Sequence, residues 1–566
     1  MHLGPSLLVA EEVDAMKYRL PGESFYEART RIADALKDND AHFRAFREIL
    51  LDQRFIPGGR IQAAMGAPRI VTPYNCFVSR TIDDSMDGIM LAATEAARTM
   101  RMGGGIGYDF STLRPRGELI KTLDSRSSGP VSFMSIFDAI CGTISSAGHR
   151  RGAQMGVLRV DHPDIEEFVK AKQNTHRLTN FNISVGITDE FMRAVEADDV
   201  FDLRWNGKTY KTVSARRLWD EIMRSTYDWA EPGVLFLDTI NRMNNLWYCE
   251  QIAATNPCSE QPLPPFGACL LGSFNLTRYI YRSGSSWEFD LSQFREDIPV
   301  VVRAMDNVVD RAAYPLERQE LEARRKRRMG LGVTGFANAI EALGFRYGDP
   351  MFLAYGATVL STLTRVAYAS SALLADEKGS FPMFQREEYL MGGFAQTLPP
   401  DVRDMIATLG IRNSHLTSIA PTGTISLTAD NVSSGIEPVF SIAYDRIVNT
   451  FDGPRVEHVE DYGYRVFGVR GKLADECSVD DHVNVLVLAS QYSDSAVSKT
   501  CNIGDDVSWE DFKGVYSKAW KGGAKGCTTF RASGKRAGIL IKREADEPAE
   551  GVACFFDPET GRKSCE

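Results

Sequence analysis

The most informative stretch of the chain reads Asn256-Pro257-Cys258-Ser259-Glu260-Gln261-Pro262-Leu263-Pro264-Pro265-Phe266-Gly267-Ala268-Cys269-Leu270-Leu271-Gly272-Ser273-Phe274-Asn275-Leu276. Its prolines and glycine exclude a helix and predict a stiff extended loop. Side chains alternate along an extended chain, so we expect Asn256, Cys258 and Glu260 to point to one side. An amide, a thiol and a carboxylate would then converge. These groups suit hydrogen bonding, sulfur chemistry and base catalysis on one small substrate.

The composition is that of an ordinary globular protein. The chain has 566 residues, of which 43% are hydrophobic and 25% charged, and it contains no internal repeat. Lys and Arg total 65 against 75 Asp and Glu, giving a formal net charge of -10, so we expect no nucleic-acid partner. We find neither an apolar run long enough to span a bilayer nor a basic signal-peptide segment, and we expect no membrane association and a cytoplasmic location.

Hydrophobic periodicity predicts an α/β protein with a mainly helical beginning. Helical spacing runs through 24–36, 86–101, 216–229 and 352–377. Buried strands are predicted at five short apolar runs: 181–185, 233–237, 330–333, 417–420 and 483–488. Strands that alternate with long helices predict a large sheet closed on itself or covered on both faces. After residue 543 the composition becomes polar, which predicts a mobile tail.

The cysteines give little information on their own. There are ten in the chain, too few for a disulfide framework, and none forms a C-x-x-C pair. We therefore expect no protein-bound metal and expect most of the thiols to be small buried hydrophobic groups.

A second motif is Ala420-Pro421-Thr422-Gly423-Thr424-Ile425-Ser426. Small hydroxyl residues around a glycine expose successive backbone N–H groups, and such a segment binds anions without a cationic side chain. Taken alone, these residues fit a simple turn better than a phosphate site.

Together the two motifs closely resemble ribonucleotide reductases, and the string from Asn256 to Pro265 is similar to the adenosylcobalamin-dependent class II enzymes. Two further segments, Met329 to Val333 and Ala532 to Arg536, also look like signatures of that family, and the similarity covers residues 55–540. The resemblance implies a ten-stranded α/β barrel with a central finger loop. This reductase core would occupy 56–543, after an N-terminal helical segment at 1–55 and before a redox tail at 544–566.

The resemblance also implies an activity, the reduction of ribonucleoside di- or triphosphates to 2′-deoxyribonucleotides by thiyl-radical chemistry. Cys258 would become the thiyl radical that takes the 3′-hydrogen, Glu260 would accept the 3′-OH proton, and Asn256 would hold a sugar hydroxyl. Cys76 and Cys269 would supply two electrons and become a disulfide. A radical generator is required because no side-chain base can remove a carbon-bound hydrogen.

Binding residues follow from the same resemblance. Substrate would be held by Gly104, Pro421, Thr422, Gly423, Thr424 and Ile425. Deoxynucleoside triphosphate effectors would select the base that is reduced, and would bind within 84–155 at Asp84, Arg114, Lys121, Ser146 and Arg150. A homodimer formed through the helical N-terminal region would host this effector site. Thioredoxin or glutaredoxin would deliver electrons through Cys554 and Cys565.

The identity of the radical generator rests on one substitution and one absence. Class I large subunits receive the radical through two adjacent tyrosines near the end of the core, where this chain has Thr528 and Thr529. Threonine cannot be oxidised as a relay. No glycyl-radical loop of the class III type is recognisable in the sequence, so adenosylcobalamin is the expected cofactor.

Some features and alternatives stay open. The chain lacks a D-x-H-x-x-G cobalamin motif, which class II enzymes do not use, and we expect Asp480-Asp481-His482 to be a solvated corner. The basic run from Arg324 to Arg328 is expected to be structural or to face a nucleotide. A class I-like large subunit that depends on a separate radical-generating subunit, and a non-catalytic nucleotide-binding regulator, remain alternative functions.

Overall fold

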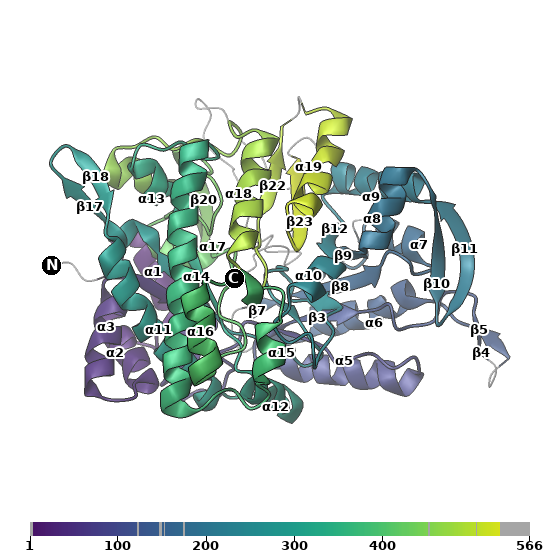
Figure 1. The fold of residues 1–566 in the computed structure, drawn as a ribbon, viewed down its shortest axis with the longest axis horizontal. Coiled ribbons are helices and arrows are strands. Elements are labelled where there is room, and N and C mark those ends of the chain that lie inside the picture. Colours follow the sequence, from purple (N-terminus) through teal and green to yellow (C-terminus); the bar gives the residue numbers. More distant parts are fainter. Residues whose placement is uncertain are drawn as a thin grey trace.

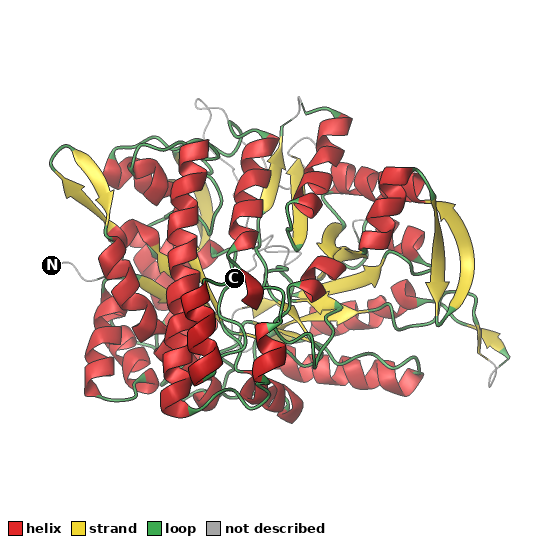
Figure 2. Cartoon of the chain, viewed as in Figure 1, coloured by secondary structure: helices red, strands yellow, loops and turns green. Residues whose placement is uncertain are grey.

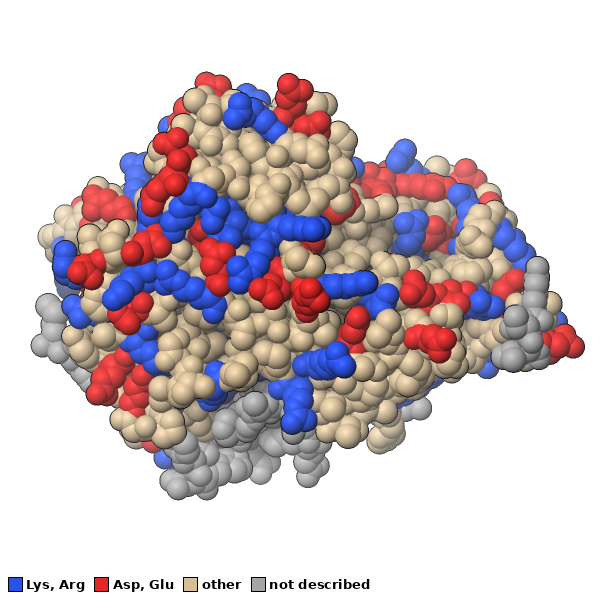
Figure 3. All heavy atoms as spheres, turned by 90° about the horizontal axis from the view of Figure 1, so that it is seen from below, with Lys and Arg blue, Asp and Glu red and all other residues tan. Residues whose placement is uncertain are grey.

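The computed structural model describes residues 4–120, 124–146, 150–151, 153–173, 176–450, 453–504 and 507–531. Helices and strands are intermixed along these ranges, and Figures 1 and 2 show a mixed α/β molecule. None of the helices in these ranges is long and apolar enough to cross a membrane. Basic and acidic side chains are interspersed on the face drawn in Figure 3, so that face presents no field of a single sign.

Three helices, α1 (Leu8–Tyr18), α2 (Phe25–Leu36) and α3 (Asp40–Leu51), precede the first strand, β1 (Phe55–Pro57). α2 begins at Ser24, which exchanges hydrogen bonds with Glu27 in a capping box. α2 and α3 pack against the long helix α11 (Leu291–Arg311), and α1 contacts α2 and the short helix α4 (Gly59–Ala64). These helices lie together at the left of Figure 1.

The largest sheet has eight strands in the order β15-β2-β3-β8-β9-β12-β23-β22. The five strands from β2 to β12 are parallel, β23 is antiparallel to β12 and parallel to β22, and β15 is antiparallel to β2. Their bounds are β2 (Cys76–Val78), β3 (Gly105–Asp109), β8 (Gln154–Arg159), β9 (Phe181–Ile187), β12 (Gly233–Phe236), β15 (Ala268–Cys269), β22 (Thr500–Ile503) and β23 (Gly526–Arg531).

A second sheet consists of β1, β16 (Leu271–Asn275) and β19 (Gly330–Thr334), with β16 parallel to β19. Only Leu270 separates β16 from β15, so one segment of chain belongs to both sheets. The segment 417–419 forms two isolated parallel bridges, Thr417 to Leu331 and Ile419 to Val497. This segment is extended, as the sequence predicts, but is not a regular strand.

The two faces of the large sheet bury different apolar clusters. In β8, Met155 and Val157 belong to a small inner cluster, whereas Leu158 belongs to the main core that the helices cover. The inner cluster also contains Ala254 and Leu263, which belong to the hairpin strands β13 (Ala254–Thr255) and β14 (Pro262–Leu263). The hairpin therefore lies on the sheet face opposite the helical layer.

Helices occur where the periodicity predicts them: α2, α5 (Met86–Arg101), α9 (Ala215–Trp229) and α14 (Pro350–Lys378). The remaining helices of eight or more residues are α6 (Pro130–Thr143), α8 (Asp189–Ala197), α12 (Glu317–Lys326), α16 (Pro400–Leu409), α18 (Val479–Gln491) and α19 (Trp509–Lys521). Two-stranded ribbons are formed by β10 (Val200–Trp205) with β11 (Lys208–Ser214), β17 (Ile280–Ser283) with β18 (Ser286–Phe289), and β20 (Ala443–Thr450) with β21 (Gly453–Glu460).

Two sequence-based expectations are wrong at the same place. The run 483–488, predicted as a strand, lies inside helix α18, because Ser478 and Asp481 form a capping box that starts the helix. A short run of Val and Leu fits a buried helix as well as a strand. His482 is fully buried beside the Lys499 ammonium, 3.1 Å from its Nδ1, and is not part of a solvated corner.

The basic run that ends α12 is structural. Glu250 forms ion pairs with Lys326 at 2.8 Å and with Arg328, and all three side chains are buried. Arg327 pairs with Asp306 at 2.9 Å and with Asp310 at 2.8 Å. These carboxylates neutralise Lys326, Arg327 and Arg328 inside the protein, so these three basic residues have a structural role.

We predict that Gly107→Ala destabilises the fold strongly, because a Cβ at Gly107 would lie 1.7 Å from the carbonyl oxygen of Thr255. Overpacking against backbone is expected to cost about 3 kcal/mol or more of unfolding free energy, measured by denaturant unfolding. The matched control is Gly514→Ala in α19, where a Cβ meets nothing within 4 Å. That change should instead stabilise the protein by about 0.5 to 1 kcal/mol. Equal stability of both variants would contradict the close packing.

Candidate active site

The informative loop is a tight turn between β13 and β14. The Asn256 N–H donates to the Gln261 carbonyl at 3.1 Å, and the Ser259 N–H donates to the Asn256 carbonyl at 3.0 Å. The Gln261 N–H donates to Oδ1 of Asn256 at 2.9 Å, and Ser259 has a φ of 69°. The expectation of a stiff extended loop is therefore wrong. An asparagine side chain that bonds to nearby backbone favours a turn, and this signal outweighs the prolines.

The turn nevertheless buries all three expected side chains. Asn256 and Glu260 are fully buried, and Cys258 is 9% exposed. Oδ1 of the Asn256 side chain accepts the hydrogen bond that holds the turn. The other polar atom of this side chain, Nδ2, has no hydrogen-bond partner within the described part of the chain. A buried amide donor of this kind costs free energy unless a ligand satisfies it.

Neighbouring segments clamp the turn in place. The Glu260 carbonyl accepts hydrogen bonds from the Ala496 N–H at 2.9 Å and from Oγ of Ser418 at 2.8 Å. The Pro257 carbonyl accepts from Nδ2 of Asn182, on β9, at 3.1 Å. The turn is thus attached on both sides of Cys258, and sequence reasoning identified none of these supporting residues. No local motif marks them, because each contact joins distant parts of the chain.

Cys76 and Cys269 lie opposite each other in the antiparallel pair of β2 and β15. Both are buried, at 1% and 0% exposure. A Cβ built on Gly105 would lie 3.3 Å from Sγ of Cys76 and 3.1 Å from Cγ of Pro257, the residue before Cys258. The cysteine pair therefore lies beside the turn, and the structure brings all five expected catalytic residues into one region.

The electrostatic environment keeps Cys269 protonated. Burial raises the pKa of its thiol well above the ordinary value, and the nearby Glu260 carboxylate and the Cys76 thiol raise the pKa further. At neutral pH Cys269 is thus a thiol that carries its hydrogen rather than a thiolate.

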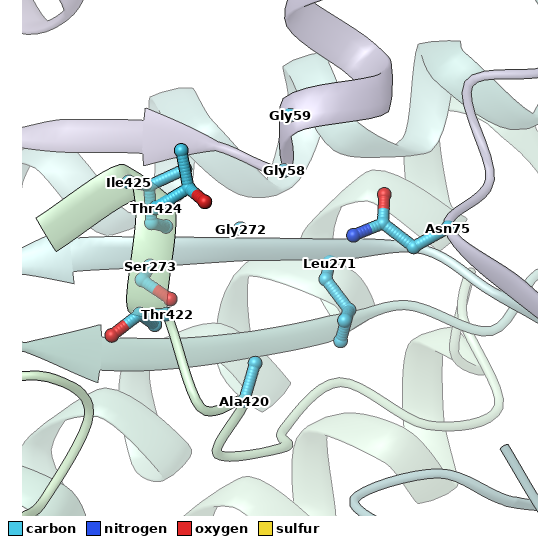
Figure 4. A pocket seen from close by; sticks show the side chains of 10 residues that line it. All are labelled: Gly58, Gly59, Asn75, Leu271, Gly272, Ser273, Ala420, Thr422, Thr424 and Ile425. Carbon is cyan, nitrogen blue, oxygen red and sulfur yellow. The ribbon is translucent and has the colours of Figure 1, made fainter. Parts of the chain in front are cut away.

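The second motif borders a small pocket. Residues 423–428 form the short helix α17. Figure 4 shows Thr422, Thr424 and Ile425 on one side of the pocket, and Gly58 and Gly59 opposite α17. The floor is formed by Leu271, Gly272 and Ser273 of β16. Thr422 is held rigidly, with a φ of 54° and a hydroxyl that accepts from the Gly435 N–H at 2.6 Å. The pocket lining also includes Asn75 and Ala420, but not Gly104, which packs against the Phe77 ring.

None of the expected effector residues in the described part of the chain lines this pocket. Asp84 and Arg114 pair with each other: Nε of Arg114 donates to Oδ2 of Asp84 at 2.7 Å. Ser146 and Arg150 are register partners in the hairpin of β6 (Ser145–Ser146) and β7 (Arg150–Arg151). Lys121, the segment 532–536 and the tail cysteines Cys554 and Cys565 lie outside the described residues.

We predict that mild oxidation with diamide links Cys76 to Cys269. Directly opposed residues of an antiparallel pair have Cβ atoms about 4.5 to 5.5 Å apart, so a small movement reaches disulfide geometry. The rate should increase with pH, because a thiolate must attack and the pKa of Cys269 is raised. Peptide mapping by mass spectrometry of the unreduced protein detects the link, and Cys269→Ser is the control. Linkage of Cys76 mainly to another cysteine would contradict the pairing.

Comparison with known proteins places this geometry in context. The family model described as ribonucleotide reductase, barrel domain, matches residues 74–465. The chain is 36% identical to the vitamin B12-dependent ribonucleoside-diphosphate reductase of Mycobacterium tuberculosis (strain CDC 1551 / Oshkosh), over 87% of this chain and 72% of that protein. A protein of the same name from Thermoplasma acidophilum is 34% identical, over 89% and 67%. The ribonucleoside-diphosphate reductase large subunit of Variola virus is 26% identical, over 66% and 53%.

Proposed function

Because the chain belongs to the ribonucleotide reductase family, we propose that it is an adenosylcobalamin-dependent oxidoreductase that converts ribonucleoside diphosphates to 2′-deoxyribonucleotides. The observation that carries the proposal is the buried turn that holds Asn256, Cys258 and Glu260 beside the Cys76 and Cys269 pair. The vitamin B12-dependent and diphosphate-reductase names of the relatives support the cofactor and the substrate class. They favour this function over a class I-like large subunit.

In the proposed reaction, a thiyl radical at Cys258 takes the 3′-hydrogen of the ribose, and Glu260 accepts the 3′-OH proton. The unsatisfied Nδ2 of Asn256 donates to a sugar hydroxyl. The 2′-hydroxyl leaves as water, and Cys76 and Cys269 supply two electrons and two protons as they form a disulfide. Cys258 then returns the hydrogen to C3′, and Glu260 returns the proton to the 3′-oxygen. The raised pKa of Cys269 supports this role, because a protonated thiol keeps its hydrogen until it is needed.

Small residues of β9, β12 and β23 lie close to one another beside the turn. A Cβ built on Gly233 would lie 3.0 Å from Oγ of Ser184 and 3.4 Å from Oγ1 of Thr528. Ser184 shares a face of β9 with Asn182, which holds Pro257. We infer that these residues hold adenosylcobalamin near Cys258. When bound, the cofactor supplies a carbon-centred radical able to oxidise a thiol. Thr529, which lies where class I large subunits have one of two adjacent tyrosines, is buried, and its hydroxyl lies 2.8 Å from that of Tyr516.

We infer that the strands close into a ten-stranded barrel around the turn. The pairings run from β2 through β3, β8, β9, β12 and β23 to β22. They continue from Val497, just before β22, through segment 417–419 to β19 and β16. β16 continues into β15, which pairs with β2 again. This circuit of ten extended segments supports the barrel that the resemblance implies.

For substrate binding we infer that the pocket beside α17 takes the phosphates, through the backbone of Pro421, Thr422, Gly423, Thr424 and Ile425. Thr422 supports this role because its hydroxyl fixes the loop and leaves the backbone N–H groups of the segment in a set orientation. Gly104, which does not line the pocket, would act by letting Phe77 pack close to β3.

Regulation and assembly are inferred in the same way. Deoxynucleoside triphosphates would bind around Asp84, Arg114, Lys121, Ser146 and Arg150.

A homodimer is supported by α5, which exposes Met86, Met90 and Leu91 to solvent while it packs against α6. Thioredoxin or glutaredoxin would reduce the thiol pair through Cys554 and Cys565, because a protein reductant cannot enter a buried site.

The proposed function predicts that Cys258→Ala abolishes deoxynucleotide formation with adenosylcobalamin, while nucleotide affinity changes less than about threefold, since the thiol acts in the chemical step. Wild-type enzyme should need adenosylcobalamin and no second protein subunit. Chromatographic detection of deoxynucleotides and equilibrium nucleotide binding are the measurements. Cys141→Ala, which removes a buried thiol of the main core, is the matched control and should retain turnover. Product formation by the Cys258 variant would refute the proposal.

The inferred effector site predicts that Arg114→Ala weakens the effect of deoxynucleoside triphosphates on base preference, because Arg114 forms an ion pair with Asp84. The measurement is the ratio of the four deoxynucleotide products under each effector. The control is Arg116→Ala, which removes an exposed arginine that pairs with Glu167. An unchanged product ratio in the Arg114 variant, or an equal change in both variants, would count against the assignment.

A further inference from the structure

The last turn of helix α1 borders the pocket beside α17. Nζ of Lys17 donates to Oγ1 of Thr424 at 3.3 Å. The neighbouring residue Tyr18 is buried, and its Cε1 lies 2.7 Å from the position of a Cβ on Gly59. Thr424 and Gly59 both line the pocket, on opposite sides of it. Two consecutive residues of α1 therefore contact both walls of the pocket.

Buried interactions fix the position of α1. The Asp14 carboxylate is fully buried and pairs with Nε of Arg19 at 2.6 Å and with the guanidinium of Arg29. At the other end of the helix, the N–H groups of Ser6 and Leu7 donate to Oδ1 of Asp430 at 2.7 and 2.9 Å. A lysine on a helix held at both ends loses less side-chain and backbone freedom on binding than one on a mobile segment.

The pocket itself has no charged lining residue in the part of the chain that the structure describes. Its lining consists of small, apolar and neutral polar residues, with Asn75, Ser273, Thr422 and Thr424 as the polar members. A diphosphate group entering the pocket would therefore meet only neutral donors there. The Lys17 ammonium is a cationic group in contact with a lining residue, and cations strengthen hydrogen bonding to phosphate.

We propose that Lys17 is a substrate-binding residue that contacts the phosphates of the ribonucleotide together with Thr424. This inference rests on the proposed function. The Thr424 hydroxyl accepts a hydrogen bond from Lys17. The hydroxyl hydrogen of Thr424 can therefore be donated into the pocket. Lys17 thus supplies positive charge and orients a neutral donor. It lies outside residues 74–465, so this part of the phosphate site comes from outside the matched barrel domain.

The test compares Lys17→Met, Lys17→Arg and the control Lys37→Met, which removes an exposed lysine at the end of α2 that pairs with Asp34. Binding of the nucleosides and of their 5′-mono- and diphosphates is measured by calorimetry on the full chain, without turnover. Lys17→Met should weaken diphosphate binding about tenfold and leave nucleoside binding unchanged. Lys17→Arg and Lys37→Met should stay within about threefold of wild type. Inorganic pyrophosphate should compete less well in the Lys17→Met variant.

Other outcomes distinguish the role of Lys17 from the proposed function of the protein. Equal loss of nucleoside and diphosphate affinity in Lys17→Met would mean that Lys17 only supports α1, and would overturn the inference. Unchanged diphosphate binding would overturn it as well. If Lys17→Met unfolds, the arginine variant decides: a loss of about tenfold with an unchanged melting temperature would overturn the role of charge. The Lys17 variants could bind nucleotides as expected while a Cys258→Ala variant still forms product. That combination would refute the proposed function but would support the contact between Lys17 and phosphate.

Discussion

The close approach of the hairpin to the sheet is the constraint on which the site depends. The Thr255 carbonyl occupies the space that any side chain at Gly107 would fill, so the hairpin backbone lies directly on β3. Backbone packed this tightly has little freedom to shift, and the next residues in the chain are the turn that carries Cys258. The position of the thiol is thus set by backbone contact rather than by side-chain packing, which tolerates more adjustment.

The same constraint explains why the site is polar but enclosed. The carbonyls of Pro257 and Glu260 are satisfied by Asn182, Ser418 and Ala496, so the turn needs no water to stabilise it. The proposed thiyl radical at Cys258 would need a place protected from competing hydrogen donors, and the burial of this turn supports that role. Nδ2 of Asn256, which has no hydrogen-bond partner among the described residues, is the donor that the proposed function assigns to the substrate.

Much of the fold and site followed from local patterns and family resemblance, and the failures have physical causes. Periodicity located α5 and α9 because long amphipathic helices carry a strong signal. It failed at 483–488, where the capping residue Ser478 decides between helix and strand. The opposition of Cys76 and Cys269, the clamp on Pro257 and the contact of Lys17 with Thr424 depend on long-range pairing, which no local pattern encodes.

One consequence follows from the junction at Leu270. Cys269 pairs with Cys76, whereas Leu271, two residues further on, forms part of the pocket floor and accepts the Gly58 N–H at 2.8 Å. No loop lies between the cysteine pair and the pocket, so a backbone movement at Cys269 would be transmitted directly to Leu271. Under the proposed function, formation of a disulfide between Cys76 and Cys269 would move β15 and, through Leu270, the pocket floor, which would couple the redox state of the thiols to nucleotide release.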